Sequence, residues 1–384
     1  MTKKRIFTVA GTRPEAIKMA PVYLELKKSQ TLEPILLATA QHRQMLDQAF
    51  AVFGIEPEFD LNLMRPGQDL AGLTSRILES VTAHLLAEKP DAVLVQGDTT
   101  TAFTSALAAF YAGIPVGHVE AGLRTYNPLS PWPEEMNRRL ISPLSRWNFP
   151  PTEASRAHLL SEKISAEQIH VTGNTVVDAL LSVRNRVAVL PEAEMLQRTG
   201  VPLAFWEKFS AGRWILVTGH RRESFGGGFE DICRAIVEIT ERFPDVGILY
   251  PVHLNPKVQE PVERLLGENS NIALIDPCSY EEFVWLMSKC YFILSDSGGV
   301  QEEAPSLGKP ALVMRDTTER PEGVDAGTCR LVGTDPDVIV AAAAELLGDS
   351  SEYERRAQLQ NPYGDGQASR RIREILEADL VDSE

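Results

Sequence analysis

Residues capable of acid/base chemistry or anion binding follow several short apolar stretches of the sequence. They are Arg13, Asp98 and Glu120 in the first half of the chain, and His220, Ser297 and Glu303 in the second half. The preceding stretches are typical of buried parallel strands, and open α/β sheets bind ligands at the carboxyl ends of their strands. Carboxylates and histidine transfer protons, whereas helix N-termini and arginine bind phosphate. These positions indicate a nucleotide or nucleotide-sugar enzyme with a group of carboxylates.

The segment Ser295–Glu303 carries the most detailed of these patterns. It follows the apolar run 291–294 and turns through Gly298 and Gly299 into a predicted helix. A helix start carries unpaired N–H groups and about half a positive charge, which suits a phosphate. Ser297 can cap the helix or bind a phosphate oxygen, and Glu303 in the expected first turn can bind a ribose hydroxyl. An ordinary turn with capping residues is the alternative interpretation.

Other candidates also have structural explanations when each is considered alone. Asp98 can cap the Thr-rich helix that follows it, whereas no helix obviously begins at Glu120. His220 can be a hydrogen-bonded residue at a helix entry or a contact to a phosphate or leaving group.

Two charge pairs lie on the helix expected after a proline-marked loop. Glu134 and Arg138 are four residues apart, and so are Glu135 and Arg139. Residues at this spacing share a helix face. The default expectation for both pairs is therefore an exposed salt bridge.

Several common nucleotide, nucleophile and metal motifs are incomplete. Residues 308–310 lack the upstream glycine and the following Ser or Thr of a P-loop. Residues 295–299 lack the first glycine of a nucleophile elbow. The first strand is not followed by GxGxxG, which argues against a tightly held dinucleotide. The histidines show no zinc spacing, so neither a metal nor a cofactor is expected.

Length and composition restrict the class of protein. The chain has 384 residues, of which 43% are hydrophobic and 24% charged, with a net charge of −15. This length suggests two domains, and the negative charge argues against nucleic-acid or anionic-membrane binding. The four cysteines lack CxxC or metal spacing and are expected to be buried thiols in a reducing compartment. Because no signal peptide or membrane span is evident, we expect a cytoplasmic protein.

Strands and helices alternate along the chain in two series. The strands are expected at 6–10, 35–39, 92–96, 115–119 and 169–171, and then at 214–217, 247–250, 272–275, 291–294 and 311–314. This alternation predicts an α/β protein with two doubly wound, Rossmann-like domains facing a cleft. The first domain is expected at 1–190, joined by a C-terminal helix at 366–384, and the second at 203–360. Residues 186–202 contain two prolines and a glycine and are the predicted linker.

Motifs along nearly the whole chain resemble the non-hydrolysing UDP-N-acetylglucosamine 2-epimerases. The matching stretches are 11–18 (GTRPEAIK), 97–101 (GDTTT), 118–124 (HVEAGLR), 133–138 (PEEMNR), 172–175 (TGNT), 219–223 (GHRRE), 250–256 (YPVHLNP), 296–310, 315–322 (RDTTERPE) and 361–366 (NPYGDG). Their order is the one found in the family. The resemblance implies a glycosyltransferase-B-like fold, a homodimer, and a role in supplying cell-surface polysaccharide.

The resemblance also implies a reaction and a set of residue roles. The family interconverts UDP-GlcNAc and UDP-ManNAc by eliminating UDP, leaving bound 2-acetamidoglucal, and adding UDP back with the C2 proton on the other face. The implied catalytic residues are Asp98, Glu120, Glu134, His220, Lys18 and Arg138. The implied UDP-binding residues are Arg13, Ser297, Gly298, Gly299, Glu303, Phe283 and Arg320.

Some bacterial members of the family bind a second UDP-GlcNAc as an activator. Gln41, Gln44 and His253 match residues implicated in that site. Gly67 stands where some activated members carry an arginine, which argues against activation by substrate in this chain.

Two other activities fit the same fold and the same UDP-binding pattern. The first is epimerisation of a related UDP-sugar, such as UDP-diacetamido-glucuronate. The second is inverting glycosyl transfer, which needs an acceptor site and one base in place of three carboxylates. A catalytically silent nucleotide-sugar sensor is a third alternative.

Overall fold

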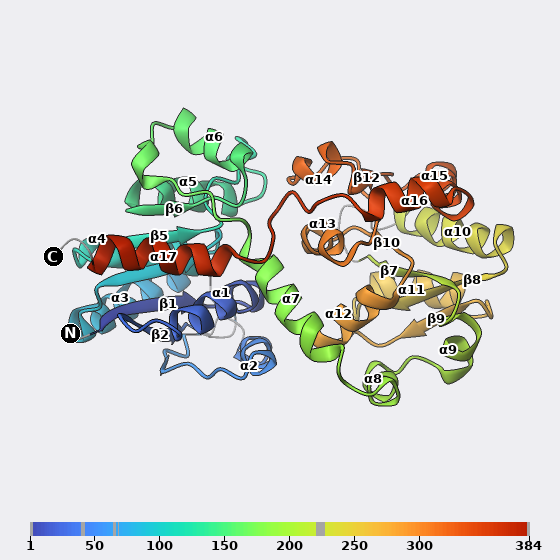
Figure 1. Cartoon of the computed structure of the whole chain (residues 1–384), viewed down its shortest axis with the longest axis horizontal. Coiled ribbons are helices and arrows are strands. Elements are labelled where there is room, and N and C mark those ends of the chain that lie inside the picture. Colours follow the sequence, from blue (N-terminus) through green and yellow to red (C-terminus); the bar gives the residue numbers. More distant parts are fainter. Residues whose placement is uncertain (1–2, 40–42, 64–66, 68, 220–226, 382–384) are drawn as a thin grey trace. The chain divides into compact units, whose positions relative to one another are not determined.

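The chain forms two compact α/β units (Figure 1). The computed structural model describes residues 3–39, 43–63, 67, 69–219 and 227–381. Unit 1 comprises Met1–Ala179 with Tyr363–Glu384, and unit 2 comprises Leu180–Pro362. Among the described residues, no helix has both the length and the apolar composition needed to cross a membrane.

Unit 1 is built on a six-stranded parallel sheet with the order β3-β2-β1-β4-β5-β6. Its strands are β1 (Lys4–Ala10), β2 (Leu32–Ala38), β3 (Phe59–Asp60), β4 (Ala92–Gln96), β5 (Val116–Val119) and β6 (Trp147–Phe149). From β1 in the middle of the sheet, β2 and β3 are added toward one edge. The chain then returns to the other side of β1, where β4, β5 and β6 are added toward the opposite edge. The loops after β1 and β4 therefore leave the sheet side by side, at the position where such folds bind ligands.

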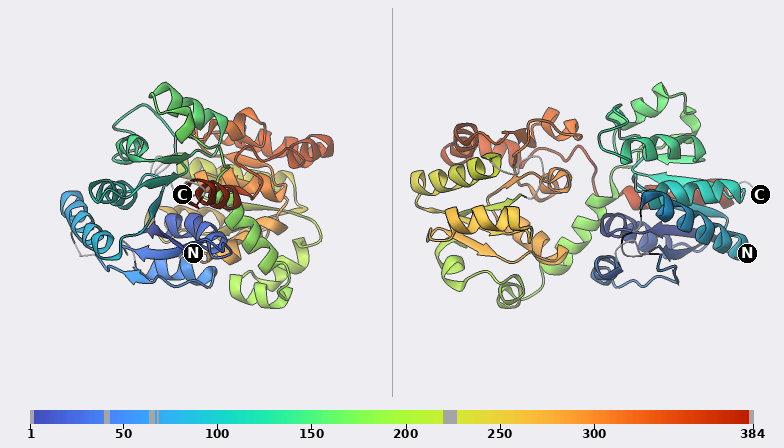
Figure 2. Two further views of the ribbon diagram at one scale, coloured as in Figure 1. Left: turned by 60° about the vertical axis from the view of Figure 1, so that its left-hand side comes forward. Right: turned by 180° about the vertical axis from the view of Figure 1, so that it is seen from behind.

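Helices cover both faces of the unit 1 sheet (Figure 2). They are α1 (Arg13–Leu26), α2 (Arg43–Val52), α3 (Leu70–Glu88), α4 (Thr100–Tyr111), α5 (Glu134–Leu144), α6 (Glu153–Ser161), the short 3-10 helix η1 (Ala166–Gln168), the beginning of α7 (Thr175–Val187) and α17 (Ala368–Val381). Side chains alternate along β1, so that Ile6 packs with α1 and α17 while Phe7 packs with α3 and α4. The C-terminal helix α17 is thus part of the core of unit 1.

Unit 2 repeats the same plan with a sheet of order β12-β11-β10-β7-β8-β9. Its strands are β7 (Arg213–Thr218), β8 (Val246–Pro251), β9 (Ile272–Ile275), β10 (Phe292–Ser295), β11 (Ala311–Val313) and β12 (Cys329–Leu331). Its remaining helices are α8 (Glu192–Thr199), α9 (Leu203–Phe209), α10 (Gly227–Arg242), α11 (Pro256–Leu266), α12 (Tyr280–Lys289), α13 (Gly298–Glu303), η3 (Ala304–Leu307), α14 (Pro321–Asp325), α15 (Pro336–Gly348) and α16 (Ser350–Ala357). The strand order reverses between β7 and β10, so the β10–α13 turn lies at the equivalent ligand-binding edge.

The predicted fold class of two doubly wound α/β domains is confirmed, but one predicted strand is wrong. Residues 169–171 form no strand, although Ile169 makes an isolated bridge with Asn148. The sequence pattern did not indicate the edge strands β3, β6 and β12, which contain two or three residues each. The predicted linker 186–202 contains the end of α7, which extends to Val187, and helix α8, which begins at Glu192.

Candidate active site

The loops after β1 and β4 are fastened together by Glu15. This side chain is almost completely buried, and its Oε2 accepts hydrogen bonds from the backbone N–H groups of Gly11 (2.9 Å) and Thr12 (2.7 Å). Its Oε1 accepts from the hydroxyl of Thr99, which lies beside Asp98 in the other loop. Burial raises the pKa of Glu15, and these hydrogen bonds oppose that rise. Glu15 therefore positions both the loop that carries Arg13 and the loop that carries Asp98.

Glu120 lies at the carboxyl end of β5 and is held by three donors. Lys18 Nζ donates to Oε1 (2.5 Å), as does Asn174 Nδ2 (3.0 Å), and Gln96 Nε2 donates to Oε2. The side chain is buried and the backbone has a φ of +64°, a left-handed conformation that is uncommon for a residue with a side chain. Strained residues of this kind cluster at functional sites. The geometry therefore strengthens the interpretation of Glu120 as a reactive group.

Asp98 lies after β4 and is paired with Arg138, whose Nε is 3.4 Å from Oδ2. Burial raises the pKa of Asp98 to about 6, with Arg138 lowering it and the charges of Glu120 and Glu134 raising it. The side chain remains 28% exposed, so it is accessible from outside the loop. A carboxyl group with a pKa near 6 can both accept and donate a proton near neutral pH.

The acidic pair at the start of α5 divides into two roles. Glu135 is fully buried, accepts from the backbone N–H groups of Thr125 and Tyr126 at 3.0 Å, and lies 3.5 Å from Arg138 Nε. Glu134 is half-buried and acts electrostatically on Asp98. Of the two, Glu134 is therefore the residue available for chemistry, whereas Glu135 anchors the preceding loop.

The expected exposed salt bridges of α5 are wrong. Arg138 is only 5% exposed and contacts Asp98 and Glu135. Arg139 pairs with Glu162 at 3.6 Å, and not with Glu135. The i,i+4 rule did not apply because α5 packs against α4, so the charged residues on its inner side meet partners from other elements.

His118 supports the turn between β4 and Asp98. It is fully buried, and its Nε2 lies 2.7 Å from the carbonyl oxygen of Gly97. Because a carbonyl only accepts, Nε2 carries the hydrogen. Burial lowers the pKa of His118 to about 4, so the ring is neutral at physiological pH and serves as a fixed donor to the Gly97 turn.

In unit 2, the guanidinium of Arg320 packs against the start of α13. A Cβ built on Gly298 would lie 2.6 Å from Arg320 Nη1, so a side chain at this position would displace the guanidinium. Arg320 donates from Nε to Glu302 (2.5 Å) and from Nη1 to Glu319 (2.8 Å). Although burial opposes it, the net effect of Arg320 and Arg315 lowers the pKa of Glu319 to about 2. Arg320 is thus held rigidly by two carboxylates beside the predicted phosphate-binding turn.

Glu303 lies at the end of α13, and not in its first turn as predicted, because the helix begins only at Gly298. Its buried side chain accepts from Tyr280 Oη at 2.7 Å. Ser297 occupies the N-cap position, but its side chain makes no capping hydrogen bond. Of its two predicted roles, capping is therefore not observed. Phe283 is half-buried on α12, the helix that also carries Tyr280.

The remaining predicted residues fall into three cases. Arg13 is half-buried in the first turn of α1, and Lys18 lies on the same helix. His253 is exposed, and its Nδ1 accepts from the backbone N–H of Asn255 at 3.1 Å. His220, Gln41 and the side chain of Gln44 lie outside the described residues.

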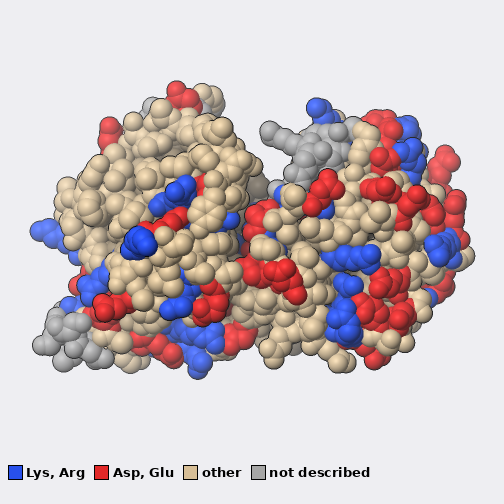
Figure 3. Space-filling model, turned by 90° about the horizontal axis from the view of Figure 1, so that it is seen from above, with Lys and Arg blue, Asp and Glu red and all other residues tan. Residues whose placement is uncertain are grey.

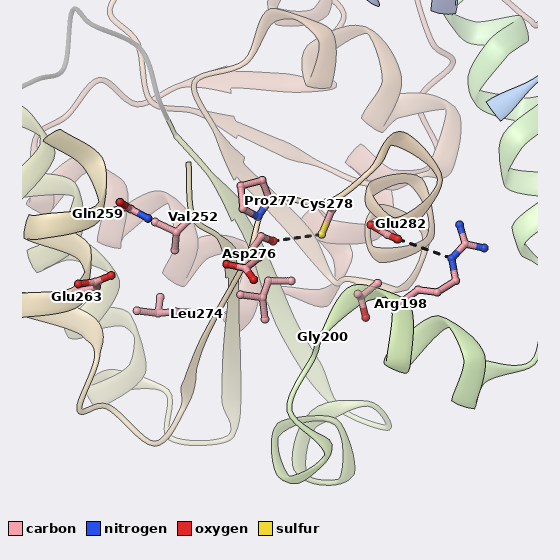
Figure 4. A pocket seen from close by; sticks show the side chains of 12 residues that line it. Arg198, Gly200, Val252, Gln259, Glu263, Leu274, Asp276, Pro277, Cys278 and Glu282 are labelled. Carbon is pink, nitrogen blue, oxygen red and sulfur yellow. Dashed lines mark hydrogen bonds and ion pairs between the residues drawn. The ribbon is translucent and has the colours of Figure 1, made fainter. Parts of the chain in front are cut away.

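A separate cavity of about 390 Å³ lies within unit 2, at the carboxyl end of β9 (Figure 4). Its wall includes the carboxylates of Glu263, Asp276 and Glu282, and Arg198, whose Nε lies 3.7 Å from Glu282. This acidic lining is a poor match for an anionic diphosphate. The described residues that line the cavity include none to which the sequence assigned a role.

The carboxylates of unit 1 lie beside cationic side chains. Lys18 and Arg138 supply positive charge to the carboxylates of unit 1. Among the described residues, no group of three or more His, Cys, Asp or Glu side chains has the arrangement of a metal site.

Four supporting residues were not identified from the sequence. Glu15 could have been found from the Thr-x-x-Glu pattern of a capping box, which it forms with Thr12. Asn174 could have been found only as a helix-start residue. Neither Gln96 nor Glu135 shows a local signal, because each acts on a residue brought to it by the fold.

Comparison with known proteins identifies one family that matches nearly the whole chain. A family model described as UDP-N-acetylglucosamine 2-epimerase matches residues 24–377. The UDP-N-acetylglucosamine 2-epimerase of Escherichia coli strain K12 is 55% identical over 377 residues, which cover 98% of this chain and 99% of that protein. The chain belongs to the UDP-N-acetylglucosamine 2-epimerase family. It is accordingly an enzyme of the isomerase class.

Solved structures of the family share the fold of the whole chain. The Neisseria meningitidis UDP-GlcNAc 2-epimerase bound to UDP-GlcNAc has a TM-score of 0.88 and 51% identity, covering 98% of this chain and 100% of that one. The Methanocaldococcus jannaschii enzyme in complex with UDP-GlcNAc and UDP has a TM-score of 0.78 and 33% identity, covering 97% and 99% of the two chains. The glycosyltransferase-B-like fold is therefore that of the family.

The pairing of Asp98 with Arg138 predicts a specific pH dependence. The pKa of Asp98 is about 6 because burial raises it more than Arg138 lowers it. Replacing Arg138 by Gln should therefore move this pKa upward. We expect kcat/KM of the wild-type protein to show an inflection near pH 6, and that of Arg138→Gln to show it at higher pH, as measured between pH 5 and 9. Arg156→Gln, which removes an exposed cation of α6, serves as the control. If the inflection stays at the same pH in Arg138→Gln, Asp98 is not the group whose titration limits kcat/KM near pH 6.

Proposed function

We propose that this enzyme reversibly interconverts UDP-GlcNAc and UDP-ManNAc by inverting C2 of the sugar. The carrying observation is the group of acidic residues in unit 1, in which Asp98 is linked to Arg138 and Glu120 to Lys18. Family membership supports the substrate, since related structures are described as bound to UDP-GlcNAc.

The chemistry proposed is anti elimination of UDP followed by its re-addition. A carboxylate removes the C2 proton, the electron pair of the C2–H bond forms the C1–C2 double bond, and the C1–O bond breaks to release UDP. The product is 2-acetamidoglucal. Re-addition of UDP at C1 with protonation of C2 on the opposite face gives the epimer, so no oxidant or reductant is consumed. Acid/base groups are therefore required on both faces of C2.

Unit 1 is proposed to supply the acid/base groups. Asp98, Glu120 and Glu134 are the carboxylates, and the raised pKa of Asp98, about 6, suits a group that must both take and return a proton. Lys18 and Arg138 hold Glu120 and Asp98 in place and offset the negative charge that develops on the leaving diphosphate.

Unit 2 is proposed to hold UDP. The backbone N–H groups of Ser297, Gly298 and Gly299 at the start of α13 suit the diphosphate, together with the guanidinium of Arg320 beside them. Arg13 and His220 are proposed to contact the same group. Glu303 is proposed to accept from the ribose, a role for which the hydrogen bond from Tyr280 orients its carboxylate. Phe283 is proposed to contact the uridine.

A homodimer is proposed through helices α3, α4 and α5 of unit 1. These neighbouring helices carry Leu86, Phe110, Tyr111, Met136 and Leu140, each of which is more than a third exposed. The space-filling view shows a broad area of unit 1 without charged side chains, whereas charges are dispersed over unit 2 (Figure 3). Exposed large apolar side chains that gather on neighbouring helices are typical of a protein interface.

Elimination and re-addition predict isotope incorporation at C2. In D2O, with UDP-GlcNAc as the only substrate, the enzyme should exchange the C2 hydrogen for deuterium and form UDP-ManNAc, as followed by NMR of the sugar protons. The mixture at equilibrium should favour UDP-GlcNAc. Transfer to an added acceptor without exchange at C2 would contradict the proposal and indicate a glycosyltransferase. Exchange at C2 of UDP-diacetamido-glucuronate but not of UDP-GlcNAc would show that the related UDP-sugar is the substrate.

Removal of the carboxylate at Glu120 should affect turnover more than binding. Glu120→Gln should slow turnover at least ~100-fold while leaving the affinity for UDP nearly unchanged, because the nucleotide is proposed to bind unit 2. Steady-state kinetics and calorimetric titration with UDP measure the two effects. Glu153→Gln, at an exposed site on α6, is the matched control. Turnover like that of the wild type would exclude Glu120 from the catalytic set.

The proposed dimer surface predicts a change of mass on substitution. The wild-type protein should sediment at about twice the 42.4 kDa of one chain, and Phe110→Asp should sediment as a monomer because the charge is buried on association. Val189→Asp introduces the same charge at a site in unit 2 that is 81% exposed and should leave the dimer intact. A dimeric Phe110→Asp would place the interface elsewhere.

A further inference from the structure

Asn174 lies where the chain leaves unit 1 and where it returns. The chain passes into unit 2 after Ala179, within the helix α7 that begins beside Asn174, and re-enters unit 1 at Tyr363. The backbone N–H of Asn174 donates to the carbonyl oxygen of Tyr363 at 2.7 Å. The outgoing and returning segments are therefore joined at this residue, inside unit 1.

Two glycines, Gly173 and Gly364, lie next to each other at this joint. A Cβ built on Gly173 would lie 3.4 Å from the Cα of Gly364. Gly173 has a φ of +90° and Gly364 a φ of +145°, conformations that side chains strongly disfavour. The local path of both segments is therefore tightly specified.

The side chain of Asn174 faces the catalytic carboxylate. Its Oδ1 accepts from the backbone N–H of Val176 at 3.1 Å, which identifies the oxygen of the amide and leaves Nδ2 on the other side. Nδ2 donates to Glu120 Oε1 at 3.0 Å. Because Asn174 is only 2% exposed, water does not readily replace this donor.

Two further donors to Glu120 among the described residues come from elements anchored in the sheet. Lys18 lies on α1, and Gln96 is the last residue of β4. Asn174 differs because the same residue is hydrogen-bonded to the returning segment at Tyr363. We call the outgoing segment at Asn174 and the returning segment at Tyr363 the crossing segments. A change in their path would move the Asn174 amide, which shares Oε1 of Glu120 with Lys18.

We propose that Asn174 is a positioning residue that couples the two crossing segments to Glu120, so that the orientation of this carboxylate follows their conformation. The inference rests on the proposed function, in which Glu120 transfers a proton at C2. Proton transfer requires the two heavy atoms to be aligned within hydrogen-bonding distance. Loss of the coupling therefore lowers kcat and leaves substrate affinity almost unchanged.

The first experiment removes the donor and retains the helix start. In Asn174→Ser the hydroxyl can still accept from Val176 N–H and the backbone N–H remains for Tyr363, but Nδ2 is absent. We expect kcat for epimerisation to fall about tenfold or more, with KM changed less than about threefold, since the donor acts on the proton-transfer step. Asp349→Ser exchanges one capping residue for another at α16 of unit 2 and should change neither constant. Circular dichroism reports whether each variant is folded.

The second experiment tests the coupling with a double-mutant cycle. Gly364→Ala strains the returning segment without contacting Glu120, and we expect it to lower kcat about fivefold in the wild type and less than twofold in Asn174→Ser, because coupled residues are non-additive. Gly173→Ala takes its place in the cycle if Gly364→Ala does not fold. Effects that multiply in the double variant would overturn the coupling.

The two proposals fail in distinguishable ways. Wild-type exchange at C2 with an unchanged kcat in Asn174→Ser would overturn the role of Asn174 and leave the proposed function standing. A fall in kcat matched by an equal rise in KM would also overturn it, because substrate binding would then be the property affected. Absence of C2 exchange in the wild-type protein would overturn both proposals.

Discussion

The strand order of each sheet is the constraint on which the candidate site depends. In each sheet the order in which the chain adds strands reverses once. The reversal lies between β1 and β4 in unit 1 and between β7 and β10 in unit 2. At such a reversal, two loops leave the sheet side by side without a crossing connection above them. The loops that carry Arg13 and Asp98 meet in this way, and Glu15 joins them by hydrogen bonds to both. The β10–α13 turn occupies the equivalent position in unit 2.

Two cationic side chains of unit 1 form ion pairs with its carboxylates. Lys18 contacts Glu120, and Arg138 lies between Asp98 and Glu135. An unpaired buried carboxylate would favour its protonated form, and too many close cations would keep it permanently ionised. The raised pKa of Asp98, about 6, results from burial that its cation only partly offsets. This balance suits a group that has to exchange a proton repeatedly.

Unit 2 uses a different arrangement around its turn. Arg320 is held by Glu302 and Glu319, so its guanidinium is oriented before any ligand arrives. Preorganised charge lowers the reorganisation needed during a reaction.

The sequence by itself determined the features that arise from short stretches of chain. Apolar runs of four or five residues identified most strands, and the residues at their carboxyl ends identified Arg13, Asp98 and Glu120. Helix starts were also readable, because capping involves residues within three or four positions. Prediction failed for the short strands β3, β6 and β12 and for helix α8, which lies within the predicted linker 186–202. Elements this short or this polar have little periodicity from which to predict them.

Only the tertiary structure decided which side chains act together. Lys18 and Glu120 are 102 positions apart, and Asn174 is 54 positions from Glu120; their meeting depends on sheet order and on the crossing segments. The neighbours Glu134 and Glu135 are chemically equivalent in the sequence, and the rotation of α5 against α4 decides that Glu135 is buried and Glu134 is accessible. Spacing along a helix specifies a shared face, but packing specifies what that face meets. For this reason Arg138 pairs with Asp98 from another loop and not with the glutamate four residues before it.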